Sequence, residues 1–392
     1  MVPKAVGLWP AGGKQVSLWD VALVDIRTAA SISKARLYLD ALRIARSLRD
    51  GNLLTDQNDT VLIHLPNCLA FAPVLLGSLT SAAKVVLVDH DADSEQLGKI
   101  LSRSRPQVIV TTIGTSGEDK VGNALLSLQE SSNAANGWAR ELIEAHKLAA
   151  TARLHPSETV PFHVRRIWTV NVNADYYGSS FLLKSPSMPV PVSRTDSQDW
   201  SVLMLPPPGH KHAGNQEPDQ VEGMNLLNQQ PRLPFGSKEA VANSSIVTIT
   251  ADGQWQTWSI TQITSMLEAL GPRLQSSRSG TWPSAGSWTS AGGLFGHLLA
   301  SISTGSSVLV LPKTSKGGLT PDQLSSFVNK HEASLVHIDV LSDAKPFVNQ
   351  ASSLRTIIVS EDTEQDSVGA IPIISIGRLL RQHTSASPLA KL

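Results

Sequence analysis

Few residues of this sequence stand at spacings that could support chemistry. His210 and His212 share a Pro-rich stretch and could bind a metal ion, but no carboxylate or cysteine stands at a matching spacing. Cys68 is the only cysteine, which excludes an intramolecular disulfide and a thiolate metal cluster. An isolated cysteine is usually a small buried hydrophobic residue. We therefore expect no metal site and no cysteine nucleophile.

Composition and charge exclude several classes of function. The 392 residues carry 33 Lys and Arg against 33 Asp and Glu, so the formal net charge is zero and no basic tract stands out. This excludes the electrostatic footprint of a nucleic-acid binder. No apolar run approaches the roughly 18 residues of a membrane-spanning helix. The N-terminal residues lack the apolar segment of a secretory signal.

The last three residues, Ala390, Lys391 and Leu392, form a small–basic–leucine tripeptide. It is similar to the Ser-Lys-Leu address that the peroxisomal import receptor reads. The segment 381–392 around it is expected to be a flexible tail. The sequence thus predicts a peroxisomal protein, with the cytoplasm as the alternative.

The elements that must position any site alternate between strands and helices. Apolar runs at 21–26, 61–65, 84–88 and 107–111 read as buried strands, and a helix is predicted at 34–50. Asn67 is expected to cap the helix that begins near Phe71. Alternation resumes near 245, with strands at 245–250, 307–311, 335–338, 354–359 and 372–376. Apolar strands that alternate with helices favour a parallel sheet covered on both faces.

The chain is therefore expected to be an α/β protein. Residues 1–112 form a first block of strands and helices, and 244–380 form a second block of the same domain. Residues 113–243 are predicted to be a long insertion, partly disordered, because 185–240 are rich in Pro, Ser, Asn and Gln. A strand near 165–172 and a helix near 138–150 are predicted inside it.

Two stretches resemble the adenylate-forming superfamily, which includes acyl-CoA synthetases and coumarate-CoA ligases. VLIHLPNCLAFAPVLLGSLTSAAKVVLVD at 61–89 is similar to the family's strand, Leu-Pro-Asn, helix and strand, and 91–112 continues the match. AGSWTSAGGLFGHLLASISTGSSVLVLPK at 285–313 resembles the segment around the Pro-x-x-His-x-x-Gly motif. Residues 351–360 resemble the strand ahead of the adenine-binding loop. The resemblance implies the layered fold of the N-terminal domain, without the C-terminal lid domain.

Members of this superfamily join a carboxylate to the α-phosphate of ATP and then to a thiol, so the resemblance implies ATP, Mg²⁺ and CoA for an active ligase. Phosphate charge is stabilised by backbone N–H groups and cations. The family places a Ser/Thr/Gly-rich loop ending in Pro-Lys-Gly after the strand at 245–250. Here that place holds Thr250, Ala251, Asp252 and Gly253, with two tryptophans and no lysine following. We interpret these residues as a vestigial nucleotide loop that has become a tight turn.

The other motifs of the family are also altered. The family histidine falls near Ser290, and the resemblance makes Trp288, Ser290 and Gly293 the candidate acyl-pocket region. His297, seven residues on, is expected to be structural. The acidic residues after Ser360 replace a Gly-rich segment, and we interpret them as a solvated turn.

The sequence therefore predicts a degenerate acyl-CoA synthetase-like protein that is not catalytic and has a binding or regulatory role. No cofactor is expected in that case, and the expected ligand is an acyl or aromatic carboxylate. One alternative is an active ATP-dependent acyl-CoA ligase with divergent motifs. A second alternative is an unrelated α/β interaction module.

Overall fold

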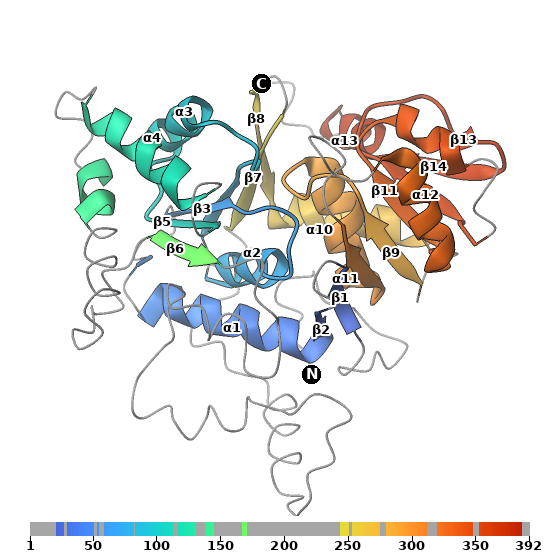
Figure 1. Cartoon of the computed structure of the whole chain (residues 1–392), viewed down its shortest axis with the longest axis horizontal. Coiled ribbons are helices and arrows are strands. Elements are labelled where there is room, and N and C mark those ends of the chain that lie inside the picture. Colours follow the sequence, from blue (N-terminus) through green and yellow to red (C-terminus); the bar gives the residue numbers. More distant parts are fainter. Residues whose placement is uncertain are drawn as a thin grey trace, which may run out of the picture. The chain divides into compact units, whose positions relative to one another are not determined.

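The protein is described from a computed structural model (Figure 1). The described residues are 21–26, 30–50, 53–54, 59–81, 83–112, 117–130, 138–144, 167–170, 244–250, 253–274, 280–311, 320–347 and 353–385. The expectations for Ala251, Asp252, His210, His212 and Ala390 to Leu392 lie outside them, as does all of 185–240.

The chain forms two compact units, and each is built from separate pieces of the sequence. Unit 1 holds the described parts of 35–65 and 70–247, and unit 2 those of 7–34, 66–69 and 248–392. The predicted division into blocks 1–112, 113–243 and 244–380 stays a prediction, because most of the middle block is not described.

Unit 2 is built on an eight-stranded sheet of order β13-β14-β12-β11-β9-β10-β1-β2. Its interior strands pair in parallel, and the pairs at both edges, β13 with β14 and β1 with β2, are antiparallel. The strands are β1 Val21–Asp25, β2 Ser31–Ser33, β9 Thr281–Ser284, β10 Ser307–Val310, β11 Leu335–Ile338, β12 Thr356–Val359, β13 Ser367–Val368 and β14 Ile371–Ser375.

Helices cover this sheet, as Figure 1 shows in its yellow to red part. They are α10 Ile260–Arg273, the π-helix η6 Gly292–Leu299, α11 Ala300–Thr304, α12 Pro321–Lys330, the 3₁₀ helix η7 Leu341–Phe347 and α13 Ile376–Ser385. The predicted start of α12 is confirmed, because Thr320 caps it and Pro321 occupies its first position. Leu324, Val328 and Phe347 of α12 and η7 join strand residues in the buried core.

The second sheet has the order β6-β5-β3-β4-β7-β8. The four neighbouring pairs from β6 across to β7 are all parallel. Its strands are β3 Thr60–His64, β4 Lys84–Leu87, β5 Val108–Thr112, β6 Ile167–Val170, β7 Ser245–Ile249 and β8 Trp255–Ser259. The unit boundary passes through β7. The helices of unit 1 include α1 Lys34–Asp50, α2 Phe71–Thr80, α3 Ser94–Ser104 and α4 Glu118–Glu130.

The burial pattern confirms the α/β class predicted from apolar strands. Every residue of β3 and β5 is buried, as expected for parallel strands covered on both faces. Among the described residues, no helix is long and apolar enough to cross a membrane.

Two local expectations differ from the structure. Asn67 does not cap α2, whose first turn follows Ala70 and has no side-chain cap. α13 continues past Arg381 to Ser385, so the predicted flexible tail begins with helical residues. Buried Ile376 and Leu379 hold the helix on its sheet, a contact that the polar composition of the tail does not reveal.

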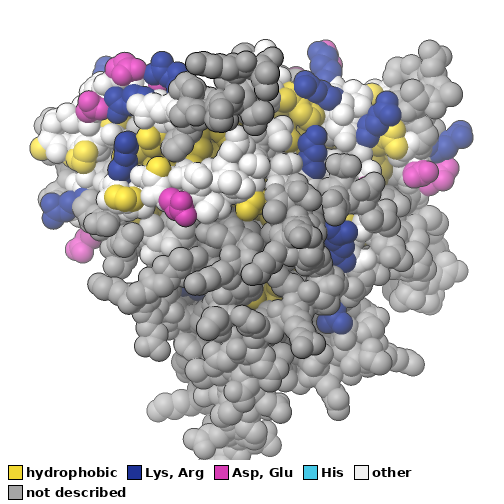
Figure 2. Space-filling model, turned by 180° about the vertical axis from the view of Figure 1, so that it is seen from behind, with side chains coloured by type: hydrophobic (Ala, Val, Ile, Leu, Met, Phe, Trp, Pro, Cys, Tyr) yellow, Lys and Arg dark blue, Asp and Glu magenta, His cyan; other side chains and the backbone are white. Residues whose placement is uncertain are grey.

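The charged surface has no single-sign field on the side shown in Figure 2. There, Lys and Arg side chains are scattered among other side chains over the described residues. The expectation that the protein does not bind nucleic acid stays a prediction.

Gly77 lets two helices of unit 1 approach closely. A Cβ on Gly77 of α2 would lie 2.7 Å from the carbonyl oxygen of Ala41 and 2.7 Å from Cβ of Ile44, both on α1. Gly98 of α3 has open space around the same position.

We predict opposite effects of alanine at these two glycines. Gly77→Ala should lower the free energy of unfolding by about 1–3 kcal/mol because it overpacks the α1–α2 contact. Gly98→Ala, the matched control, should raise it by about 0.5–1 kcal/mol because glycine is a poor helix former. Urea unfolding measures both, and equal effects would contradict the close helix contact.

Candidate functional site

Polar side chains gather where the interior strands of the eight-stranded sheet end. Ser284 is the last residue of β9, His337 lies in β11, and Ser360 follows β12 directly. The three strands are parallel neighbours, with His337 in register with Ser284, so their carboxyl ends meet at one edge. Ligands of open α/β sheets bind at this edge. We therefore take this edge as the candidate site.

A chain of hydrogen bonds runs through these side chains. Nδ1 of His337 lies 3.1 Å from Oγ of Ser284, and its Nε2 lies 2.9 Å from Oγ of Ser360. Ser360 donates to Oδ1 of Asp339 at 3.0 Å, and the indole of Trp288 donates to Ser284 at 3.1 Å. The chain joins a buried indole to a half-buried carboxylate through one imidazole.

His337 is neutral in this setting. It is completely buried, and burial lowers its pKa to about 3. Burial removes the water that would solvate a charged imidazolium, and no carboxylate among the described residues contacts this ring to replace that stabilisation. Burial therefore favours the neutral form. Both ring nitrogens are hydrogen-bonded, so neither tautomer leaves a buried polar atom without a partner.

His297 lies beside this chain, inside η6. Its ring is completely buried, 5.5 Å from the ring of His337 and stacked on Trp288 at 6.5 Å between centroids. Nε2 is 3.0 Å from the carbonyl oxygen of Trp282. Burial, and then the neighbouring His337, lowers the pKa of His297 well below its ordinary value. These contacts fit the structural role expected from the sequence.

Asn67 holds the loop that follows β9. Its Nδ2 donates to the carbonyl oxygen of Gly286 at 2.7 Å, and its Oδ1 accepts from the backbone N–H of Trp288 at 3.0 Å. The expected capping role is therefore wrong. The amide instead satisfies two backbone groups more than 200 positions away in the sequence, which local patterns cannot indicate.

The candidate acyl-pocket residues do come together here. Trp288 is completely buried. Ser290 accepts from the backbone N–H of Gly293 at 3.1 Å and donates to the carbonyl oxygen of Ser287 at 2.8 Å, so it caps the first turn of η6. A Cβ on Gly293 would lie 3.0 Å from Cε1 of His337. Their roles in binding stay predictions.

The turn between β7 and β8 is closed by its own backbone. Thr250 N–H donates to Gln254 O, and Gly253 N–H donates to Thr250 O, both at 2.9 Å. Gln254 N–H donates to Oγ1 of Thr250 at 3.0 Å. Gly253 has a positive φ of 80°, which glycine adopts without strain. The predicted tight turn is confirmed at Thr250 and Gly253.

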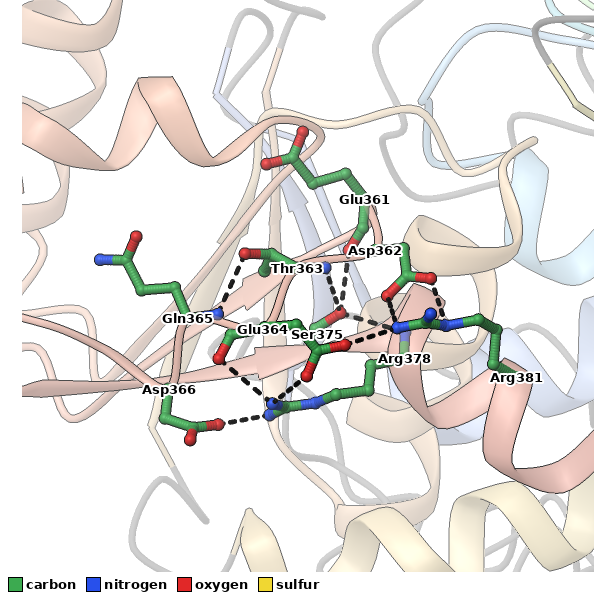
Figure 3. A network of polar contacts seen from close by, with 9 residues as sticks. All are labelled: Glu361, Asp362, Thr363, Glu364, Gln365, Asp366, Ser375, Arg378 and Arg381. Atoms are coloured by element: carbon green, nitrogen blue, oxygen red, sulfur yellow. Dashed lines mark hydrogen bonds and ion pairs between the residues drawn. The ribbon is translucent and has the colours of Figure 1, made fainter.

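The acidic segment after Ser360 is exposed but paired. Figure 3 shows the carboxylates of Asp362, Glu364 and Asp366 pointing toward two arginines of α13, whereas that of Glu361 points away from them. Arg378 contacts Asp366 at 2.5 Å, and Arg381 contacts Glu364 at 2.8 Å and also Asp362. Such exposed pairs are each worth about 0–1 kcal/mol, so they orient the segment more than they stabilise the fold.

Backbone contacts fix the same segment. Oγ of Ser375 accepts from Thr363 N–H at 3.2 Å and donates to Glu361 O at 3.0 Å (Figure 3). A Cβ on Gly377 would lie 2.7 Å from the backbone nitrogen of Asp362. The solvated acidic turn predicted from the sequence thus packs closely against the start of α13.

A second polar group lies at the carboxyl edge of the other sheet. His64, buried at the end of β3, lies 3.0 Å from Oγ1 of Thr111 and stacks on His90 at 5.1 Å. Lys120 donates to the carbonyl oxygens of His90 and Ala92. Burial, with the nearby His90 and Lys120, lowers the pKa of His64 to about 3. Nδ1 of His64 thus has a partner, whereas its buried Nε2 has no hydrogen-bond partner among the described residues.

Sequence patterns missed the residues that organise the site, namely His337, Ser284, Ser360, Asp339 and Asn67. The sequence signal that could have indicated them is a polar residue within an apolar strand or directly after it. Among the described residues, no group of three His, Cys, Asp or Glu side chains is placed to hold a metal ion.

Comparison with known proteins identifies the fold. Residues 17–191 match the family described as AMP-binding enzyme. A benzoate CoA ligase from Burkholderia xenovorans superimposes with a TM-score of 0.55 at 12% identity, over 92% of this chain and 57% of that one. No curated protein matches the sequence significantly.

Two further structures give the same result. The N-terminal domain of FACL13 from Mycobacterium tuberculosis has a TM-score of 0.51 at 11% identity, over 90% of this chain and 70% of that one. An ATP-bound RpMatB-BxBclM chimera has a TM-score of 0.53 at 12% identity, over 89% of this chain and 53% of the chimera. This chain thus spans little more than half of the benzoate CoA ligase. These likenesses show a shared fold, and the alternative of an α/β interaction module stays a prediction.

The buried histidines predict how stability depends on pH. The folded-state pKa of His337 and of His64 is about 3, below the ordinary value of 6.5. Between these values the unfolded state binds more protons, so stability is complete above pH 6.5 and is lost as the pH falls toward 3. Each histidine should contribute a slope of about 1.4 kcal/mol per pH unit.

Urea unfolding between pH 4 and 7 measures this slope. His337→Gln should reduce it by the equivalent of one proton, whereas the same change at exposed His331 should alter it little. An unchanged slope in His337→Gln would show that His337 is already protonated in the folded protein.

Proposed function

We propose that this chain, an acyl-CoA ligase-like protein with an AMP-binding family domain, does not catalyse ATP-dependent ligation and has a binding or regulatory role. ATP, Mg²⁺ and CoA serve the family in general.

The turn at 250–254 is the observation that carries the proposal. A phosphate cradle needs backbone N–H groups that point at the ligand. At Thr250, Gly253 and Gln254 these groups all donate within the turn. No lysine follows in β8, where Trp255 and Trp258 stand instead. The residues present at this place do not fit a triphosphate.

Two further contacts support the same conclusion. Ser290 stands where the resemblance places the family histidine, and its hydroxyl is used to cap η6. The segment after β12, where the resemblance places an adenine-binding loop, carries four carboxylates and is tied to α13. Negative charge there opposes a polyphosphate ligand.

The ligand that fits the proposal is an acyl or aromatic carboxylate without nucleotide. The peroxisomal address at Ala390, Lys391 and Leu392 is part of the same proposal, with the import receptor as partner. Microscopy of an N-terminally tagged chain tests it: punctate signal should become diffuse when Leu392 is deleted, and an unchanged pattern would contradict the address.

The nucleotide experiment is a thermal shift with Mg²⁺-ATP. A ligand that binds only the folded state raises the melting temperature by mass action. We expect no shift at millimolar ATP and no pyrophosphate release with fatty or aromatic acids. Gly253→Ala should lower stability by about 1 kcal/mol through its positive φ, without any effect on ATP response.

A clear ATP shift that Gly253→Ala abolishes would establish the turn as a nucleotide loop. Pyrophosphate release with any acid would establish the alternative, an active ligase with divergent motifs.

A further inference from the structure

Ser360 is placed as an activated serine would be. It follows the buried strand β12 at the carboxyl edge of the sheet and is half-buried. Its Oγ lies 2.9 Å from Nε2 of His337, within reach of a general base. On the other side its hydroxyl donates to Oδ1 of Asp339 at 3.0 Å, so the proton must turn from Asp339 toward Nε2 before His337 can accept it.

The base has its own orienting partner. Nδ1 of His337 lies 3.1 Å from Oγ of Ser284, which can accept from Nδ1–H and donate to the carbonyl oxygen of Gly286 at 3.3 Å. The indole of Trp288 also donates to Ser284. This arrangement supports the tautomer that leaves a lone pair on Nε2, facing Ser360. Nucleophile, base and orienting group thus form one connected series.

The start of η6 lies against the same hydroxyl. A Cβ on Gly292 would lie 2.5 Å from Cα of Ser360 and would also collide with its Oγ. η6 continues as α11, so a helix running from Gly292 to Thr304 begins at this serine. The partial positive charge of a helix N-terminus stabilises an oxyanion.

We propose that Ser360 is a nucleophile that accepts an acyl group from an activated ester or thioester, with His337 as its general base. Oγ of Ser360 forms a bond to the carbonyl carbon while its proton passes to Nε2 of His337. The bond to the leaving thiolate or alkoxide breaks, and that group takes the proton. Water then attacks the acyl-serine by the same route and releases the carboxylic acid and the free serine.

This activity goes beyond the proposed function and is independent of it, because the reaction uses no nucleotide. Loss of ATP binding can be confirmed while Ser360 proves inert, and the reverse can also occur.

Burial makes His337 a weak base. This limits the rate of acylation of Ser360 and also predicts how that rate depends on pH. The charged or titratable groups that face its ring are His297 from η6 and Asp339, the latter through Ser360. With a pKa of about 3, His337 is fully unprotonated from pH 5 to 8. The rate of acylation should therefore be slow and nearly constant over that range.

The test is labelling of the full-length chain with an alkyl fluorophosphonate, which phosphonylates activated serines, followed by peptide mass spectrometry. We expect one label, on Ser360, absent in Ser360→Ala. The labelling rate should fall at least tenfold in His337→Asn and also in Ser284→Ala, which removes the orienting hydroxyl and with it the acceptor of the Trp288 indole. Ser367→Ala, at an exposed serine of β13, is the matched control and should label at the original rate.

Thermal melts keep the result interpretable, because only variants that melt cooperatively are compared. No label on Ser360 in the folded protein would overturn the proposal. Labelling of Ser360 at the same rate in Ser284→Ala and His337→Asn would also overturn it, since the serine would then react without the base. A rate that rises through an inflection near pH 7 would exclude His337, as it is placed here, as the base.

Discussion

The buried imidazole of His337 has partners for both of its nitrogens, and these two contacts organise the carboxyl edge of the eight-stranded sheet. His337 lies in the middle of the sheet with no exposure to water, and its two partners are Ser284 and Ser360. An unsatisfied polar atom at such a position would cost about 1–3 kcal/mol. The two serines are held in turn by Trp288 and Asp339. The loop after β9 and the segment after β12 are thereby fixed relative to each other.

Hydrogen bonds within the protein also occupy the places where the resemblance puts the family's nucleotide-binding motifs. Described polar groups at these places bind other groups of the protein. In the turn after β7, the N–H groups of Thr250 and Gly253 donate to carbonyl oxygens of the same turn. Ser290 caps a helix, and the segment after Ser360 pairs with α13. Together these contacts support the proposal that this chain binds no triphosphate.

At this edge the half-buried hydroxyl of Ser360 lies between the imidazole of His337 and the carboxylate of Asp339. The parallel sheet places these strand ends side by side, whether or not the chain binds nucleotide. Function in such folds depends on the residues at the strand ends more than on the fold itself.

Apolar periodicity was sufficient to predict most elements from the sequence, because strand burial and helix faces are encoded by neighbouring residues. The fully buried β3 and β5, the start of α12 at Thr320 and the turn at Gly253 followed from such local patterns. The family resemblance, carried by 61–112 and 285–360, correctly indicated the layered fold.

Long-range partners could not be read in this way. Asn67 looked like a helix cap but binds Gly286 and Trp288, and the tail near Arg381 looked flexible but is helical. His337, Ser284 and Ser360 stand far apart in the sequence and carry no shared motif. Only the parallel pairing of β9, β11 and β12 brings them within hydrogen-bond distance, because register between strands is set by the packing of the whole sheet.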